Sequence, residues 1–250
     1  MANLCHEGGK GLALGPADSG AVFSEVILGL YFIESSGVSA FFAKYDAVGN
    51  FVWGYQLAAT TLVSILGIEA DNNGDVLICG SYRGSIDLDA TSGTNTVSST
   101  PANQSDAFVA KYNGIGSFVW GFDLGGSQHE YAYDLAIDNS NNVYVAGEIQ
   151  STTDFDPGSG TAIASAGVLN DYFVAKYSSS GNYQWVSEPS AGTTSTVTAI
   201  DWDPSNVLYV RGQFVDSTLF DVATGEIAAY EPGPGSSNGA GSFVAQMDAG

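Results

Sequence analysis

Short segments in which apolar and polar side chains alternate recur along the chain, and each has the length of a β-strand. In the segment FVAKY, which begins at Phe108, the Phe, Ala and Tyr side chains point to one face of an extended strand and the Val and Lys side chains to the other. The pair Gly116-Ser117 follows, and then a second apolar segment, FVWGFDL. Two such segments around a Gly-containing turn predict an antiparallel hairpin.

The same pattern occurs four times at nearly constant spacing. The copies begin at Phe41, Phe108, Phe173 and Phe243, which are 67, 65 and 70 residues apart. Three positions recur without a gap in the first three copies: Trp53, Trp120 and Trp185 lie twelve residues after the start, Asp71, Asp138 and Asp203 thirty, and Gly80, Gly147 and Gly212 thirty-nine. Such a period is typical of a repeat protein, in which each unit buries its apolar face against the next.

A second hairpin in each copy completes a unit of about four antiparallel strands. Its strands are LGIEAD and DVLICGSY, then YDLAID and NVYVAGEI, then TAIDWD and VLYVRGQF, and each pair is joined by a turn rich in Asn, Asp or Gly. Strands that are apolar on both faces predict an all-β fold in which sheets pack on sheets, as in a β-propeller. We expect residues 1–250 to form one four-bladed propeller domain, with blades at approximately 10–58, 63–124, 131–189 and 196–250.

The longest loops follow the repeated Gly, and each contains a short acidic element. These elements are Asp87-Leu88-Asp89, Asp154-Phe155-Asp156 and Phe220-Asp221. Because the element recurs, we interpret it as a turn that packs Leu88, Phe155 or Phe220 onto the blade, with a ligand or metal role as the alternative.

The segments FVAKYNGIGSFVW, LAIDNSNNVYVAG and DFDPGSG resemble the bacterial β-propeller repeat of secreted and cell-surface proteins, often called the SBBP repeat. The resemblance covers almost the whole chain and implies a propeller fold. It also implies a location outside the cell or on its surface. The family is defined by its repeat and supplies no catalytic motif.

The charge of the chain limits its partners. It has 27 acidic and 6 basic residues, a formal net charge of −21 at pH 7. Such a surface is a poor partner for nucleic acid or an anionic membrane, and it attracts cations. No apolar stretch approaches the length of a membrane span, so we expect no membrane insertion. The N-terminal residues lack the basic start and apolar run of a signal peptide, so the extracellular expectation rests on the resemblance and on the Lys-poor composition.

The fourth copy contains SFVAQMD and then lacks its last strand. An open blade presents unpaired N–H and C=O groups, which form an adhesive edge. We expect the segment Ala2, Asn3, Leu4 and Cys5 to supply the missing strand and close the propeller within its own chain. The alternative is insertion into a neighbouring copy, which builds a filament.

One turn has the spacing of a calcium loop. Asp71, Asn73 and Asp75 occupy the alternate positions that oxygen ligands use in such loops, but no bidentate Glu follows at the expected distance. Asx-rich hairpin turns need the same residues for their own hydrogen bonds, and we favour this structural reading over calcium binding.

Candidate ligand-binding residues are few, and no residue is predicted to be catalytic. His129 lies beside Glu130 in a variable loop position, and we interpret it either as a solvated side chain or as a residue of a binding site. Arg211 occupies the repeat position of Cys79 and Ala146, so we expect it to pair with an acidic residue between blades or to point into the central channel.

The two cysteines, Cys5 and Cys79, fall outside any metal or disulfide spacing. We expect both to be free thiols, with Cys79 buried in an inner strand.

These observations favour a non-enzymatic extracellular scaffold for protein–protein interaction or self-assembly, such as a filament or surface-layer subunit. It would bind another protein or copies of itself and would require no cofactor, with calcium as an optional ligand. The alternative is an extracellular glycan-binding module or enzyme with its site at the channel mouth.

Overall fold

The structure is a computed structural model, and it describes residues 12–14, 25–34, 37–167, 170–187, 195–215 and 240–248. Every regular element in these ranges is a β-strand, which confirms the predicted all-β class. Within the same ranges no helix is long and apolar enough to cross a membrane.

Most strands belong to four antiparallel sheets, which we number in chain order. The first sheet contains β1 (Leu12–Leu14), β2 (Glu25–Glu34), β3 (Gly37–Asp46) and β4 (Phe51–Ala58). The second contains β5 (Leu62–Ala70), β6 (Val76–Arg83), β9 (Asp106–Tyr112) and β10 (Phe118–Leu124). The third contains β11 (Glu130–Ile137), β12 (Val143–Ile149), β15 (Asp171–Tyr177) and β16 (Tyr183–Ser187). The fourth contains β17 (Ser195–Asp203), β18 (Val207–Val215) and β19 (Ala240–Asp248).

Two small hairpins interrupt the second and third sheets in sequence. One pairs β7 (Ser85–Asp87) with β8 (Thr96–Ser98), and the other pairs β13 (Thr152–Asp154) with β14 (Ile163–Ser165). They carry the acidic elements of the long loops, and Leu88 and Phe155 are fully buried there. The predicted packing of these two side chains is confirmed, whereas Phe220 lies outside the described residues.

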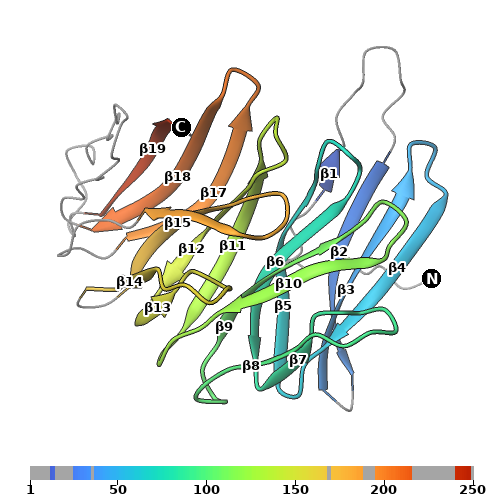
Figure 1. Cartoon of the computed structure of the whole chain (residues 1–250), viewed down its shortest axis with the longest axis horizontal. Helices are drawn as coiled ribbons and strands as arrows, with labels where there is room; N and C mark the ends of the chain where they lie inside the picture. The colour runs from blue at the N-terminus through green and yellow to red at the C-terminus, as the bar shows by residue number, and fades with distance from the viewer. Residues whose placement is uncertain are drawn as a thin grey trace.

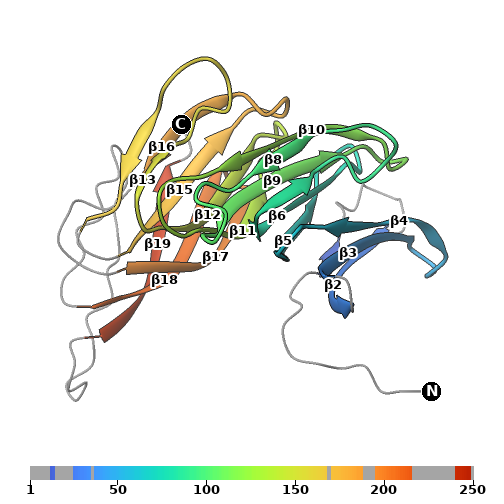
Figure 2. The same ribbon diagram turned by 90° about the horizontal axis from the view of Figure 1, so that it is seen from below.

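The four sheets follow one another in space in the order of the chain (Figure 1). The first and fourth sheets lie at opposite ends of the row in both views (Figure 2). The described strands therefore form an open row, and closure into a four-bladed ring stays a prediction. So does the assignment of residues 1–250 to one domain. The proposed closing strand, Ala2–Cys5, falls outside the described residues.

The hydrophobic core lies between successive sheets rather than within one. Phe42 and Trp53 of the first sheet pack with Tyr112 of the second. The second and third sheets share another cluster, which includes Leu77 and Phe173. A further cluster joins the third and fourth sheets. The second and third sheets are therefore buried on both faces, which explains their nearly continuous apolar strands.

The register places the repeated residues opposite one another. Each repeated Trp pairs with the repeated Lys of the neighbouring strand: Trp53 with Lys44, Trp120 with Lys111 and Trp185 with Lys176. The predicted equivalence of the three Trp positions is therefore confirmed.

The repeated Gly has a steric reason. A Cβ at Gly80 would lie 1.9 Å from the Ser64 carbonyl oxygen, and one at Gly147 would lie 1.9 Å from that of Tyr131. In both hairpins the strand register shifts one to three residues after this carbonyl group on the innermost strand. The shift places the backbone of the innermost strand over the Gly. No other residue fits at this position without moving the strand.

Candidate functional site

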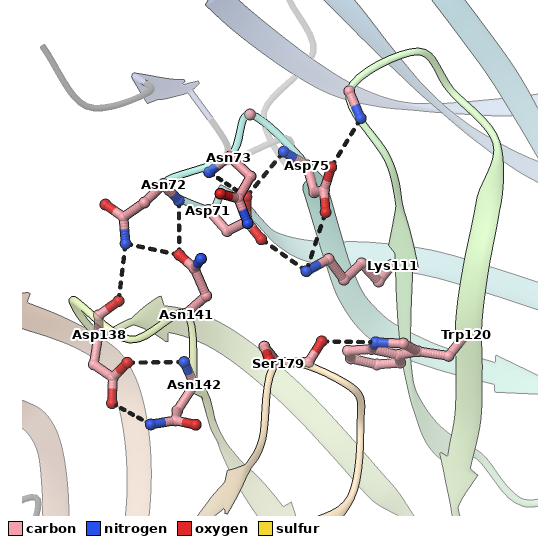
Figure 3. Close-up of polar contacts among 12 residues, drawn as sticks. Asp71, Asn72, Asn73, Asp75, Lys111, Trp120, Asp138, Asn141, Asn142 and Ser179 are labelled. Atoms are coloured by element: carbon pink, nitrogen blue, oxygen red, sulfur yellow. Dashed lines mark hydrogen bonds and ion pairs between the residues drawn. The ribbon is translucent and has the colours of Figure 1, made fainter. Parts of the chain in front are cut away.

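The turn between β5 and β6 holds the residues of the proposed calcium loop (Figure 3). Asp71 is fully buried, and its Oδ1 accepts hydrogen bonds from the backbone N–H groups of Asn73 at 2.8 Å and Asp75 at 3.0 Å. The Lys111 Nζ lies 2.7 Å from Asp71 Oδ2 and 3.2 Å from Asp75 Oδ2. This ammonium contacts both carboxylates and offsets one of their two negative charges, so a calcium ion would have to displace it. Calcium binding at the turn stays a prediction.

Asn side chains link the equivalent turns of successive sheets. Asn72 donates to Asn141 Oδ1 from its backbone N–H at 2.9 Å and from its side chain at 2.7 Å. Asn139 is the equivalent residue in the third sheet, and it donates to Asn206 Oδ1 at 3.3 Å. In the fourth sheet this position is Pro204, which has no side-chain donor. The series of linked turns therefore ends at the fourth sheet.

Lys44 and two of the repeated Trp side chains, Trp53 and Trp120, also reach the next sheet. Lys44 Nζ and Trp53 Nε1 both donate to the Gly114 carbonyl, each at 3.1 Å. Trp120 Nε1 donates to the Ser179 carbonyl at 3.2 Å, which is the same turn position one sheet further along (Figure 3). These repeated polar side chains stabilise the junctions between sheets and are occupied by that role.

The other predicted site residues lie apart. His129 Nδ1 accepts a hydrogen bond from the Ser105 backbone N–H at 3.0 Å, and burial lowers the pKa of His129. Glu130 is fully buried, its Oε1 accepts from Ser151 Oγ at 2.7 Å, and burial raises its pKa. Arg211 instead lies exposed on β18, and it forms no ion pair with another described residue. The structure thus brings His129 and Glu130 together but leaves Arg211 on a different sheet.

Cys79 is a free and fully buried thiol, as predicted, and burial raises its pKa. Cys5 falls outside the described residues.

Near Glu130, a hollow of about 500 Å³ lies where the second and third sheets meet, and we call it the acidic hollow. Its lining is polar and consists of Ser98, Thr100, Asp106, Asp123, Gly125, Gly126, Ser127, Thr152 and Asp154. Burial, with Glu130 and Asp123 nearby, raises the pKa of Asp106 to about 8. Burial also raises the pKa of Asp123, whose Oδ2 accepts from Tyr82 Oη at 3.0 Å.

The acidic hollow could not be predicted from the sequence, because Asp106 and Asp123 lie at ordinary strand positions, at the start of β9 and near the end of β10. One signal was present in the repeat itself. The first copy has the uncharged residues Ser39 and Gln56 at these two positions, so the acids are not required by the strands.

A second hollow, of about 350 Å³, is lined by the innermost strands β5, β11 and β17. Glu69, Asp134 and Asp201 lie in its wall, one from each strand. Burial raises the pKa of Glu69 to about 7, and the charges of Asp134 and Asp201 act in the same direction. The wall of this hollow combines these three acids with apolar side chains such as Leu66 and Ile200.

No other element of the described part of the chain covers the outer face of the fourth sheet. Tyr209 is 41% exposed and Val244 is 53% exposed. The residues at the same two repeat positions in the second and third sheets are fully buried: Leu77, Tyr144, Val109 and Val174. Arg211 lies on this face between them, where the second and third sheets have the buried Cys79 and Ala146.

Exposed apolar side chains also occur on β4 and β10, the outer strands of the first two sheets, and in the turns that precede these strands. They are Val48, Phe51, Val52, Ile115 and Val119, and the turn that carries Ile115 lies against Trp53 of β4. The third sheet has Ser180 and Gln184 where the second has Ile115 and Val119. Exposed apolar groups that gather in one place are typical of interaction surfaces.

Two curated proteins are similar to this chain, and no family model matches it. One is the "Uncharacterized WD repeat-containing protein L264" of Acanthamoeba polyphaga mimivirus, 19% identical over 67% of this chain and 14% of that protein. The other is the "Regulatory protein FlaEY" of Caulobacter vibrioides, 28% identical over 69% of this chain and 17% of that protein. The chain spans less than a fifth of the length of either relative.

Removal of the Lys111 ammonium should destabilise the fold. In Lys111→Met the fully buried Asp71 carboxylate loses its counter-charge, and we expect the free energy of unfolding in urea to fall by about 3 to 5 kcal/mol. Adding Asp71→Asn removes the uncompensated charge and should restore part of the loss, since the amide oxygen still accepts from the turn. Equal stability of Lys111→Met and the wild type would contradict this role.

The Asp106 carboxyl should make stability depend on pH. Its pKa of about 8 in the folded chain exceeds the ordinary value of 3.8, so the folded chain keeps a proton that the unfolded chain loses. Stability should therefore fall as pH rises through the window between these values. Asp106→Asn cannot take up this proton. Its free energy of unfolding should therefore rise relative to that of the wild type as pH increases through the window, and the difference between the two proteins should stay constant above it. Parallel pH profiles of the two proteins would refute the assignment.

Proposed function

We propose that this chain is an extracellular β-propeller-type scaffold that binds protein partners, including copies of itself. The observation that carries the proposal is the open face of the fourth sheet, which holds Tyr209, Arg211 and Val244. Tyr and Arg are enriched among the residues that contribute most to binding at protein interfaces.

The repeat architecture supports the scaffold. Each sheet packs on the next through apolar clusters, and the repeated Lys, Trp and Asn side chains stabilise the junctions. WD repeats form propeller blades of four strands, and one similar protein is named as WD repeat-containing. Repeat proteins of this kind present wide surfaces to partners.

The location rests on the resemblance to the SBBP repeat and on the composition. A chain with 27 acidic and 6 basic residues repels anionic surfaces and stays soluble by charge repulsion. The interaction surfaces are apolar patches within this acidic surface, so partner contact buries Tyr209 and Val244.

A glycan-binding function remains the second candidate, and the acidic hollow is the observation that favours it. Carboxylates and hydroxyl groups, which suit the hydroxyls of a sugar, line this hollow. His129 and Glu130 lie beside it, but Arg211 belongs to the fourth sheet, so a single site with all three is not assembled.

The proposal predicts that the chain assembles through the open face. Mass photometry over a range of protein concentrations should show defined assemblies for the wild type. The double variant Tyr209→Ser, Val244→Ser should weaken assembly about tenfold or more, because it removes apolar area that partner contact buries.

The matched control is Ile163→Ser, which changes an exposed Ile on β14 away from both the open face and the apolar group that contains Val119. It should leave assembly through the fourth sheet unchanged. A photo-crosslinker at position 244 extends the test to other partners from the native source. A chain that stays single and gives no protein adduct there would contradict the proposal.

A further inference from the structure

The acidic hollow contains a buried acceptor without a donor. Asp106 is 3% exposed and lines the hollow, yet its Oδ1 has no hydrogen-bond partner. Buried polar atoms are almost always hydrogen-bonded, because an unpaired one loses its hydrogen bonds to water and forms none with the protein. No described residue therefore supplies a hydrogen-bond donor to Asp106 Oδ1.

The third sheet shows how the fold satisfies the same residue when no ligand is needed. Asp171 occupies the repeat position of Asp106, and it is also buried. Its Oδ2 accepts a hydrogen bond from the Gly167 backbone N–H at 2.6 Å. In the first sheet the position is Ser39, which carries no charge. The Thr100 backbone N–H interacts with the Asp106 carboxyl in a comparable way, yet Asp106 Oδ1 still has no hydrogen-bond partner.

The surroundings of Asp106 are rich in negative charge. Asp123 and Asp154 line the same hollow, and Glu130 lies close enough to raise the pKa of Asp106. None of the lining residues is Lys or Arg. The remaining lining groups are hydroxyls and glycine backbone, so the wall offers many acceptors and no compensating positive charge.

We propose that the acidic hollow binds a small organic cation through a primary ammonium group. An ammonium has three N–H donors and one positive charge, which match an unpaired carboxylate oxygen in an acidic wall. The volume of about 500 Å³ is that of a small-molecule site. In the described part of the chain, no three acidic, His or Cys side chains are placed to hold a bare metal ion.

Binding is coupled to the titration of Asp106. Three titratable groups face this carboxyl: Glu130 from β11, Asp123 from β10 and Tyr82 from β6. A bound ammonium favours the ionised carboxylate, so binding releases a proton at neutral pH. Affinity should therefore rise with pH up to about 8 and then level off.

Titration calorimetry with the whole chain tests the proposal, with putrescine, glucosamine and neutral glucose as probes. We expect saturable binding of at least one of the two amines at one site, with proton release, and no binding of glucose. Putrescine binding alone identifies a polyamine-type ligand, and glucosamine binding alone identifies an amino sugar. Both outcomes support the shared ammonium chemistry.

Two variants separate the site from general charge attraction. Asp123→Asn removes one wall carboxylate and should weaken amine binding about tenfold or more. Asp201→Asn removes the same charge from the inner hollow and should leave the affinity within about twofold. The proposal is overturned if neither amine binds, if glucose binds as well, if only calcium binds, or if Asp201→Asn is as damaging as Asp123→Asn.

Discussion

The fold depends on one constraint: the second and third sheets are apolar on both faces, so each of them is stable only between two neighbours. Leu77 and Val109 of the second sheet, and Tyr144 and Val174 of the third, are fully buried because the next sheet covers them. The polar contacts follow the same direction along the chain. Lys44 and Trp53 reach the second sheet, and Asn72 reaches the third. Burial supplies the driving force, and these hydrogen bonds fix the register of one sheet on the next.

The residues that form these structural contacts can be separated from those that depart from the repeat, and this separation indicates where function lies. The repeated Asp71, Lys111 and Trp120 are occupied by structural bonds. Features that break the repeat are free for other roles, and two stand out. Among the described sheets the series of linked turns ends at the fourth, where Pro204 has no side-chain donor and Arg211 is exposed. Asp106 lies in the wall of the acidic hollow, and its Oδ1 has no hydrogen-bond partner.

The sequence alone predicted what local patterns and fixed spacing determine. Strand alternation predicted the all-β class, and the repeat predicted the equivalence of the three Trp positions. Recurrence also identified Leu88 and Phe155 as packing residues. Contacts between side chains that are far apart in the sequence could not be predicted from it. The Lys111 ammonium between Asp71 and Asp75, and the hollow around Asp106, depend on side chains from separate strands that no spacing rule connects. The open row likewise depends on the angles between sheets rather than on any one repeat.

Hydrogen–deuterium exchange tests most directly whether neighbouring sheets supply the stability. The comparison is between two strands at equivalent repeat positions: β12, which is covered on both faces, and β18, which has one open face. At a concentration where the chain is a single copy, the account predicts that amides of β12 exchange about 100-fold more slowly than those of β18. Equal protection of the two strands would contradict it.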